Sequence, residues 1–230
     1  MVYKAVLFDL YGTLVPPFRM RQHITTIEEI AKILDVDFDD LHEGWVRDFP
    51  RRMQGEFSSV AQNLECIVQK LGKFPNPNVL AEAANVYRQF TIEGLAPKSG
   101  AIEFLKWLSW HEIRTGLVSN CSPDVVEVWE TSSLAPYFGY CAFSCQERMI
   151  KPNIAIYRTV LNALEVDPSE TLYVGDGSDE ELTGALQCGM QAVLFQEDLS
   201  NTYDAHRSDV ETWKGIVVRS FENLYEIITG

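Results

Sequence analysis

The 230-residue sequence lacks several features that mark membrane and secreted proteins. No apolar run approaches the roughly 18 residues that a membrane-spanning helix needs. Lys4 and Asp9 interrupt the apolar start, and no cleavage site of small residues comes after it, so we expect no signal peptide. The chain also has no internal repeat and no low-complexity segment. These absences predict a cytoplasmic protein that does not associate with membranes.

The cysteines show no paired pattern. The five cysteines are an odd number and form no Cys-x-x-Cys motif, which is typical of reduced thiols in the cytosol. Cys141 and Cys145 lie four positions apart, but no second ligand pair accompanies them, which argues against a zinc site.

The chain also has fewer basic than acidic residues. The chain has 19 Lys and Arg residues against 33 Asp and Glu residues, a formal net charge of −14. Nucleic acids and anionic membrane surfaces bind basic faces, so we expect neither as a partner. A small anionic substrate stays compatible, because local donors and a metal ion can outweigh a distant field. The composition leaves the oligomeric state open.

Strand and helix patterns alternate along most of the chain. Short apolar strands are predicted at residues 3–8, 115–118, 140–143, 171–174 and 191–195, and residues 215–218 close the set. Helical patterns cover 101–110, 123–131, 153–164, 180–188 and 221–228. This alternation predicts right-handed βαβ units and an α/β fold with a parallel sheet. Residues 196–214 are polar and show no clear pattern.

A helical block is inserted after the first strand. It lies between two breaks, Pro16-Pro17 and Pro97-Lys98-Ser99-Gly100, and its periodicity predicts helices from about residue 19, at 38–53, after the Ser58 cap to residue 71, and at 79–91. Residues 1–15 and 96–230 are therefore predicted to form the core domain, and residues 16–95 a helical domain. Trp45, Phe49 and Phe57 are interpreted as core of that helical domain, and the four histidines receive no role.

Polar residues stand at the ends of several predicted strands. Asp9 comes after the first, Ser119 after the second and Asp176 after the fourth, while Lys151 lies in a loop before a helix. Carboxyl ends of neighbouring parallel strands converge on one crevice, so these groups are expected to meet. Two converging acids imply a cation between them or a raised pKa on one. Mg²⁺ fits, because it takes hard oxygen ligands and keeps waters for a substrate phosphate.

These residues resemble the four motifs of the haloacid dehalogenase-like (HAD) hydrolase superfamily, in order and over essentially the full chain. The motifs are Asp9-Leu10-Tyr11-Gly12-Thr13-Leu14, the strand end Leu117-Val118-Ser119-Asn120, Lys151-Pro152, and Val174-Gly175-Asp176-Gly177-Ser178-Asp179-Glu180-Glu181. The resemblance implies a Rossmann-like core with a mobile helical cap and a covalent intermediate on Asp9. It also implies Mg²⁺ held by Asp9, Asp176 and the backbone carbonyl of Tyr11.

Tyr11 departs from the phosphatases of this superfamily, which carry a second Asp there as general acid and base. A carboxylic acid can protonate a poor leaving group and then activate water, which a phenol with a pKa near 10 does badly. Haloacid dehalogenases are similar to this sequence at this position, because they carry Tyr and release a halide that needs no proton. Metal-free dehalogenases replace the acid of the fourth motif by a hydroxyl residue, whereas Asp176 is retained here. The sequence therefore combines a dehalogenase-like first motif with a phosphatase-like fourth.

The leading hypothesis is a Mg²⁺-dependent phosphatase that acts on a small anionic metabolite. The alternatives are a 2-haloacid dehalogenase, a phosphonate-cleaving enzyme that would need a cap lysine (Lys32, Lys70 or Lys73), and a slow or non-catalytic relative. Asp9, Lys151 and Ser119 are the catalytic candidates. The substrate-binding candidates are Tyr11, Thr13, Asn120, and the cap arginines Arg47 and Arg51 with their neighbour Arg52, all three of which could instead face solvent. Glu181 is expected to orient Lys151 or to hold metal-bound water, unless it is a plain first-turn acid.

Overall fold

The computed structural model describes residues 3–196 and 207–230. Within them lies one parallel sheet with the strand order β3-β2-β1-β4-β5-β6. Its strands are β1 (Ala5–Phe8), β2 (Arg114–Ser119), β3 (Tyr140–Phe143), β4 (Thr171–Gly175), β5 (Gln191–Phe195) and β6 (Ile216–Val218). The predicted α/β class with a Rossmann-like parallel sheet is confirmed.

Strand β1 lies in the middle of the sheet and is fully buried. Its last residue, Phe8, pairs with Leu117 of β2 and with Val174 of β4. Because all three strands run in the same direction, the residues just beyond these positions emerge at the same edge of the sheet. Asp9 therefore lies beside the ends of β2 and β4.

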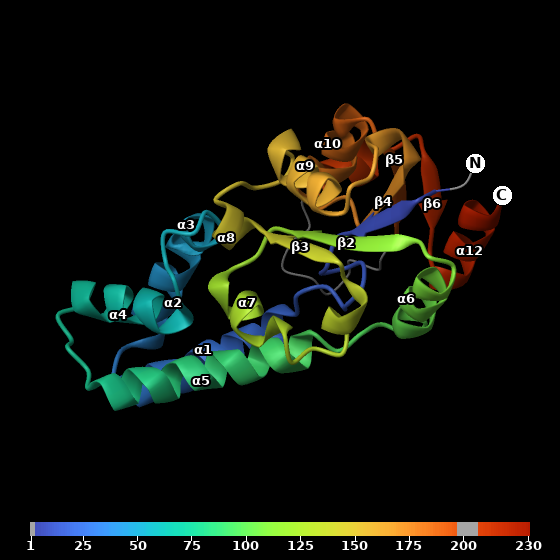
Figure 1. Cartoon of the computed structure of the whole chain (residues 1–230). Coiled ribbons are helices and arrows are strands. Elements are labelled where there is room, and N and C mark those ends of the chain that lie inside the picture. Colours follow the sequence, from blue (N-terminus) through green and yellow to red (C-terminus); the bar gives the residue numbers. More distant parts are fainter. Residues whose placement is uncertain (1–2, 197–206) are drawn as a thin grey trace.

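Helices cover both faces of the sheet (Figure 1). Val6 and Phe8 point to the side of α6 (Ala101–Trp110), α7 (Pro123–Trp129) and α12 (Phe221–Thr229). Ala5 and Leu7 point to the side of α9 (Ile154–Ala163) and α10 (Glu181–Cys188). Since both faces are buried, the strands read as continuous apolar runs, which is typical of parallel sheets. Shorter helical pieces are η1 (Ala135–Tyr137), α8 (Ser144–Glu147), η2 (Pro168–Glu170), η3 (Ser178–Glu180) and α11 (Ser208–Thr212).

The inserted block is helical and has its own buried cluster. It contains α1 (Met20–Leu34), α2 (Phe38–Arg47), α3 (Phe49–Met53), α4 (Val60–Lys70) and α5 (Pro77–Gly94). Helices α1 and α5 lie side by side and extend away from the sheet (Figure 1). Every buried member of the cluster comes from positions 27–87. This separate cluster supports the predicted division into a core of 1–15 and 96–230 and a cap of 16–95, which stays a prediction.

The single helix predicted over 38–53 is wrong, because the chain breaks into α2 and α3 at Asp48. Pro50 explains the break: it has no N–H to donate, and its ring would clash inside a continuing helix. The break turns Phe49 away from the buried face that holds Leu41 and Trp45, and Phe49 is 46% exposed. Its interpretation as cap core is therefore wrong as well.

Two further expectations concern the rest of the chain. In the pattern-free stretch 196–214 the structure describes α11, while residues 197–206 lie outside the described residues. None of the described helices combines the length and apolarity that crossing a bilayer requires.

Leu64 provides a test of the cap cluster, because it is fully buried in α4 whereas Leu186 in α10 is 50% exposed. We expect Leu64→Ala to lower the free energy of unfolding by about 2–5 kcal/mol, since it removes buried methyl groups and leaves a cavity. Leu186→Ala, the matched control, is expected to cost less than about 1 kcal/mol. Urea unfolding curves measure both, and equal losses would contradict the cluster.

Candidate active site

Asp9 comes directly after β1 and is held from two sides. Its backbone N–H donates to the Val174 carbonyl at 2.9 Å and extends the sheet by one residue. The Thr13 hydroxyl donates to Asp9 Oδ2 at 3.2 Å, and the chain turns through Gly12 at φ +80°. Asp9 is only 4% exposed. Thr13 thus positions Asp9, and its predicted contact with substrate stays a prediction.

Lys151 joins two buried acids. Its Nζ lies 2.6 Å from Asp9 Oδ1 and 2.6 Å from Glu181 Oε2. Glu181 also accepts hydrogen bonds from the Tyr173 hydroxyl and the Gly177 N–H, which fix its direction. Burial alone would lower the pKa of Lys151, but the Asp9 and Glu181 carboxylates outweigh it and raise the pKa well above its ordinary value. Lys151 therefore stays an ammonium, in the ion pair with Glu181 that was one of the expected arrangements.

Asp176 completes an acidic cluster. Asp9, Asp176 and Glu181 each offer a carboxylate oxygen, and these oxygens lie within 4.8 Å of one another. Asp176 Oδ1 accepts from the Ser178 N–H and hydroxyl, and its Oδ2 lies 2.8 Å from Nη2 of Arg207. Burial is the main cause, and the negative charge of Asp9 the second, of a rise in the pKa of Asp176 to about 6. The positive charge of Arg207 lowers this pKa and so limits the rise.

The lack of a side chain at Gly12 lets Asp176 come close enough to Asp9 for the two carboxylates to share a divalent cation. A Cβ built on Gly12 would lie 1.8 Å from Asp176 Oδ2. The Asp176 carboxylate therefore occupies the space that a side chain at position 12 would fill. Buried carboxylates this close repel one another unless a cation lies among them. All the donors are hard oxygens, and the residues present could therefore hold a divalent cation.

Ser119 is the last residue of β2 beside this cluster, and Asn120 follows it. Ser119 is 1% exposed and lines the same cavity as Asp9 and Lys151. Asn120 is engaged by the protein: its Oδ1 accepts from the Lys151 N–H at 2.9 Å, and its Nδ2 donates to Asp179 at 2.6 Å. Asn120 therefore holds the Lys151 loop in place, and its predicted role in substrate binding stays a prediction.

A cavity of about 380 Å³ opens above the acidic cluster, between core and cap. Its core side includes Asp9, Ser119, Lys151 and Asp176, and its cap side includes the aromatic residues Phe18, His23, Trp45, Phe49 and Tyr87. Tyr11 also lines it and meets Phe18 edge-on, with ring centroids 6.3 Å apart. Trp45, Phe49 and His23 thus form part of the cavity wall, a position that the sequence pattern did not indicate.

Of the three cap arginines, the structure places Arg52 at the cavity, whereas Arg47 and Arg51 do not line it. Arg52 is 2% exposed, and its guanidinium stacks on Trp45 at 4.0 Å from the ring centroid. Its Nη1 donates to the Trp45 carbonyl and to Asn63 Oδ1, each at 2.8 Å. Arg51 pairs with the buried Asp48 and the exposed Glu56, and the Arg47 side chain is 51% exposed.

His23 Nδ1 and Asp124 Oδ1, both in the cavity wall, are buried polar atoms without a hydrogen-bond partner among the described residues. Burial, with smaller contributions from His42 and Arg52, lowers the pKa of His23 to about 4, so its ring is neutral at pH 7. Burial raises the pKa of Tyr11 well above 10, and Asp124 adds to this. Tyr11 is therefore a protonated phenol that can donate a hydrogen bond but cannot act as a base.

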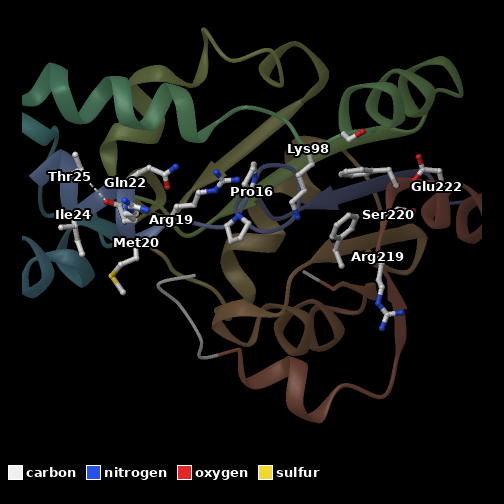
Figure 2. A pocket seen from close by; sticks show the side chains of 15 residues that line it. Pro16, Arg19, Met20, Gln22, Ile24, Thr25, Lys98, Arg219, Ser220 and Glu222 are labelled. Carbon is white, nitrogen blue, oxygen red and sulfur yellow. Dashed lines mark hydrogen bonds between the residues drawn. The ribbon is translucent and has the colours of Figure 1, made fainter. Parts of the chain in front are cut away.

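A second, more open cavity of about 1200 Å³ lies at the hinge between cap and core (Figure 2). Pro16, Lys98 and Arg219 are among its lining residues (Figure 2). Lys98 Nζ donates to the Gly12 carbonyl at 2.5 Å and so links the second hinge segment to the Asp9 loop. None of the predicted catalytic residues lines this cavity.

The family model for haloacid dehalogenase-like hydrolases matches residues 3–189, and the chain belongs to this family. Among curated relatives, it is 27% identical over 201 residues to glyceraldehyde 3-phosphate phosphatase of Methanopyrus kandleri, covering 84% of each chain. It is also 27% identical over 207 residues to (S)-2-haloacid dehalogenase of Xanthobacter autotrophicus, covering 86% of this chain and 78% of that one.

Solved structures from both branches share the fold. A HAD phosphatase from Thermococcus onnurineus matches with a TM-score of 0.65 and 22% identity, covering 99% of this chain and 98% of that one. The 2-haloacid dehalogenase of Pseudomonas syringae pv. Tomato DC3000 matches with a TM-score of 0.71 and 19% identity, covering 100% and 99%. The protein is thus a hydrolase of this family, and the residues of its own site determine which reaction it catalyses.

Gly12 yields a test of the acidic cluster. We expect Gly12→Ala to abolish the rise in melting temperature that Mg²⁺ causes, because the new Cβ would displace Asp176. Gly72→Ala is the matched control: Gly72 has φ +76°, close to the +80° of Gly12, but nothing lies within 4 Å of its added Cβ. Both variants carry a backbone strain of about 1 kcal/mol. Melting curves with Mg²⁺ or EDTA measure the difference, and a full Mg²⁺ response in Gly12→Ala would refute this interpretation of the cluster.

Proposed function

We propose that the protein is a Mg²⁺-dependent phosphatase that hydrolyses a small phosphorylated metabolite through an aspartyl-phosphate on Asp9. The observation that carries the proposal is the retention of Asp176 within reach of Asp9, in a cluster that includes Glu181. Phosphoryl transfer develops charge on equatorial oxygens, which a metal ion offsets, whereas displacement of a halide has no such requirement. Several curated relatives also carry the name glyceraldehyde 3-phosphate phosphatase.

Asp9 is the nucleophile of the proposed reaction. One of its oxygens attacks phosphorus and forms a new P–O bond, while the bond from phosphorus to the leaving oxygen breaks and that oxygen takes the electron pair. The Lys151 ammonium offsets the negative charge of Asp9, and the hydrogen bond from the Thr13 hydroxyl holds the Asp9 carboxylate in its orientation. Water then cleaves the aspartyl-phosphate, which releases phosphate and restores Asp9. Asp9, Asp176 and the Tyr11 carbonyl would hold Mg²⁺, which would supply charge stabilisation for the phosphoryl group.

The substrate is constrained by Tyr11 and by the cavity. Because the phenol of Tyr11 stays protonated and is a weak acid, it gives little help to a leaving group of high pKa. A leaving group that departs without a proton, such as a phenolate, suits this site better than a sugar alkoxide. The aromatic cap wall offers stacking to such a group, and a volume of about 380 Å³ limits it to a small molecule.

The assignment of Ser119 as a catalytic residue and of Asn120 and Thr13 as substrate-binding residues belongs to the same proposal. In this proposal Arg52, which lines the cavity, takes the substrate-binding role that was predicted for Arg47 and Arg51. A cytoplasmic enzyme without nucleic-acid or membrane partners is consistent with the acidic composition.

Carbon–halogen cleavage is the second candidate, and Tyr11 is the observation that favours it. In that reaction Asp9 would attack carbon, halide would leave, and water would hydrolyse the ester. The phosphonate alternative needs a cap lysine at the substrate, and within the described residues the cavity is lined by Lys151 alone among lysines. We therefore do not propose it.

A paired assay separates the two candidates. We expect phosphate release from p-nitrophenyl phosphate with Mg²⁺, loss of that release with EDTA, and no halide release from a 2-haloacid. Asp9→Asn should lower turnover by at least about a thousandfold, because an amide oxygen is a poor nucleophile. Halide release that persists in EDTA would establish the dehalogenase instead, and activity retained in Asp9→Asn would remove the covalent mechanism.

The leaving-group preference is a separate prediction. We expect kcat/KM for an aryl phosphate to exceed that for a sugar phosphate by at least about tenfold, because Tyr11 gives little help to an alkoxide. Tyr11→Asp should raise the rate with the sugar phosphate more than the rate with the aryl phosphate. Faster hydrolysis of the sugar phosphate by the unaltered enzyme would contradict the role given to Tyr11.

A further inference from the structure

We propose that Arg207 competes with the divalent cation for Asp176, so that the guanidinium has to leave this carboxylate when the cation binds. The proposal rests on the cation site of the proposed function and adds a residue to it. Arg207 lies outside the four motifs and outside the residues 3–189 that the family model matches.

The contact is direct and buried. Nη2 of Arg207 lies 2.8 Å from Asp176 Oδ2, and its side chain is 6% exposed. Arg207 lines the same cavity as Asp9, Lys151 and Asp176. The Asp176 oxygen that it contacts is the one that fits into the space at Gly12. A cation held by Asp176 and Asp9 would therefore meet the guanidinium at this carboxylate.

The backbone at Arg207 is held in place by Asp209, two residues further on. Asp209 is 3% exposed, and its Oδ2 accepts hydrogen bonds from the Leu182 N–H at 2.8 Å and the Thr183 N–H at 3.1 Å. Its Oδ1 accepts from the Thr183 hydroxyl at 2.5 Å. Asp209 thereby caps the first turn of α10, where a carboxylate is favoured by the unpaired N–H groups. This anchor brings the chain at Arg207 to the acidic cluster.

Charge explains why the two cations exclude each other. Three acids, Asp9, Asp176 and Glu181, meet two cations, Lys151 and Arg207, at the buried end of the cavity. The acidic excess is at most one charge, so a divalent ion added to the full set would leave a cationic excess in a buried site. Repulsion between the ion and a guanidinium on the same carboxylate is strong there, because water screens it little.

The guanidinium is held loosely enough to leave. Within the described residues, the buried Nε of Arg207 has no hydrogen-bond partner, so the group makes fewer hydrogen bonds than it can. An arginine with unsatisfied donors gains by moving toward a new acceptor. The cavity that Arg207 lines is where the phosphate of a substrate would lie, and phosphate oxygens accept from guanidinium in a forked geometry.

The experiment measures Mg²⁺ affinity without any turnover. EDTA-treated protein is titrated with MgCl₂ by calorimetry and, independently, by the rise in melting temperature. We expect Arg207→Gln, which removes the charge but keeps a hydrogen-bond donor, to bind Mg²⁺ about tenfold more tightly than the unaltered chain. Arg207→Lys keeps the charge and is expected to stay within about threefold of the unaltered chain.

Arg219→Gln is the matched control for net charge. Arg219 is an exposed arginine of the hinge cavity (Figure 2) and does not line the catalytic cavity. Its replacement should leave Mg²⁺ affinity unchanged. Unchanged or weaker affinity in Arg207→Gln overturns the proposal, and so does an equal gain in Arg219→Gln, which would assign the effect to net charge.

The outcomes also separate this proposal from the proposed function. Tighter Mg²⁺ binding in Arg207→Gln without phosphate release by the unaltered chain supports the competition and refutes the phosphatase. Absence of Mg²⁺ binding in the unaltered chain and in every variant refutes both.

Discussion

The site depends on the burial of Asp9, Asp176 and Glu181 so close together that their oxygens lie within 4.8 Å of one another. Burying three carboxylates together costs free energy, because they lose their hydration and repel one another, unless cations lie beside them. Lys151 bridges Asp9 and Glu181 with two contacts of 2.6 Å, and Arg207 contacts Asp176. Under the proposed function, the negative charge of these three acids would attract a divalent ion, and Arg207 offsets part of that charge.

The backbone is shaped to allow this crowding. Parallel pairing of β1 with β4 brings Asp9 and Asp176 to one edge of the sheet. Gly12 leaves room for the Asp176 carboxylate, and Gly175 does the same for Glu181, because a Cβ on Gly175 would lie 2.3 Å from Glu181 Oε1. Two glycines thus admit two carboxylates, which is why these positions exclude a side chain.

The residues at strand ends could be predicted as site residues from the sequence, because the carboxyl ends of parallel strands converge. The residues that reach the site through tertiary contacts could not be predicted. Asp9 and Asp176 each follow directly after a strand, so the strand topology brings these two together, whereas Lys151 reaches them from the loop between α8 and α9. Arg207 lies in a polar stretch without periodicity, and its place is set by hydrogen bonds from the backbone of α10 to Asp209. Arg52 was one of three neighbouring arginines, and only the break before Pro50 determines which of them turns inward.

The two ends of the cavity differ in chemistry, and this difference constrains the substrate. At the core end, charged groups surround Asp9 and suit a phosphate. At the cap end the wall is aromatic and also includes Arg52, and His23 Nδ1 and Asp124 Oδ1, which have no hydrogen-bond partner among the described residues, can accept hydrogen bonds. Because His23 has a pKa of about 4, its ring carries no charge at pH 7 and does not attract a second anionic group. Under the proposed function, this difference favours a small molecule whose phosphate lies at the core end and whose flat apolar part, carrying a hydrogen-bond donor, lies at the cap end.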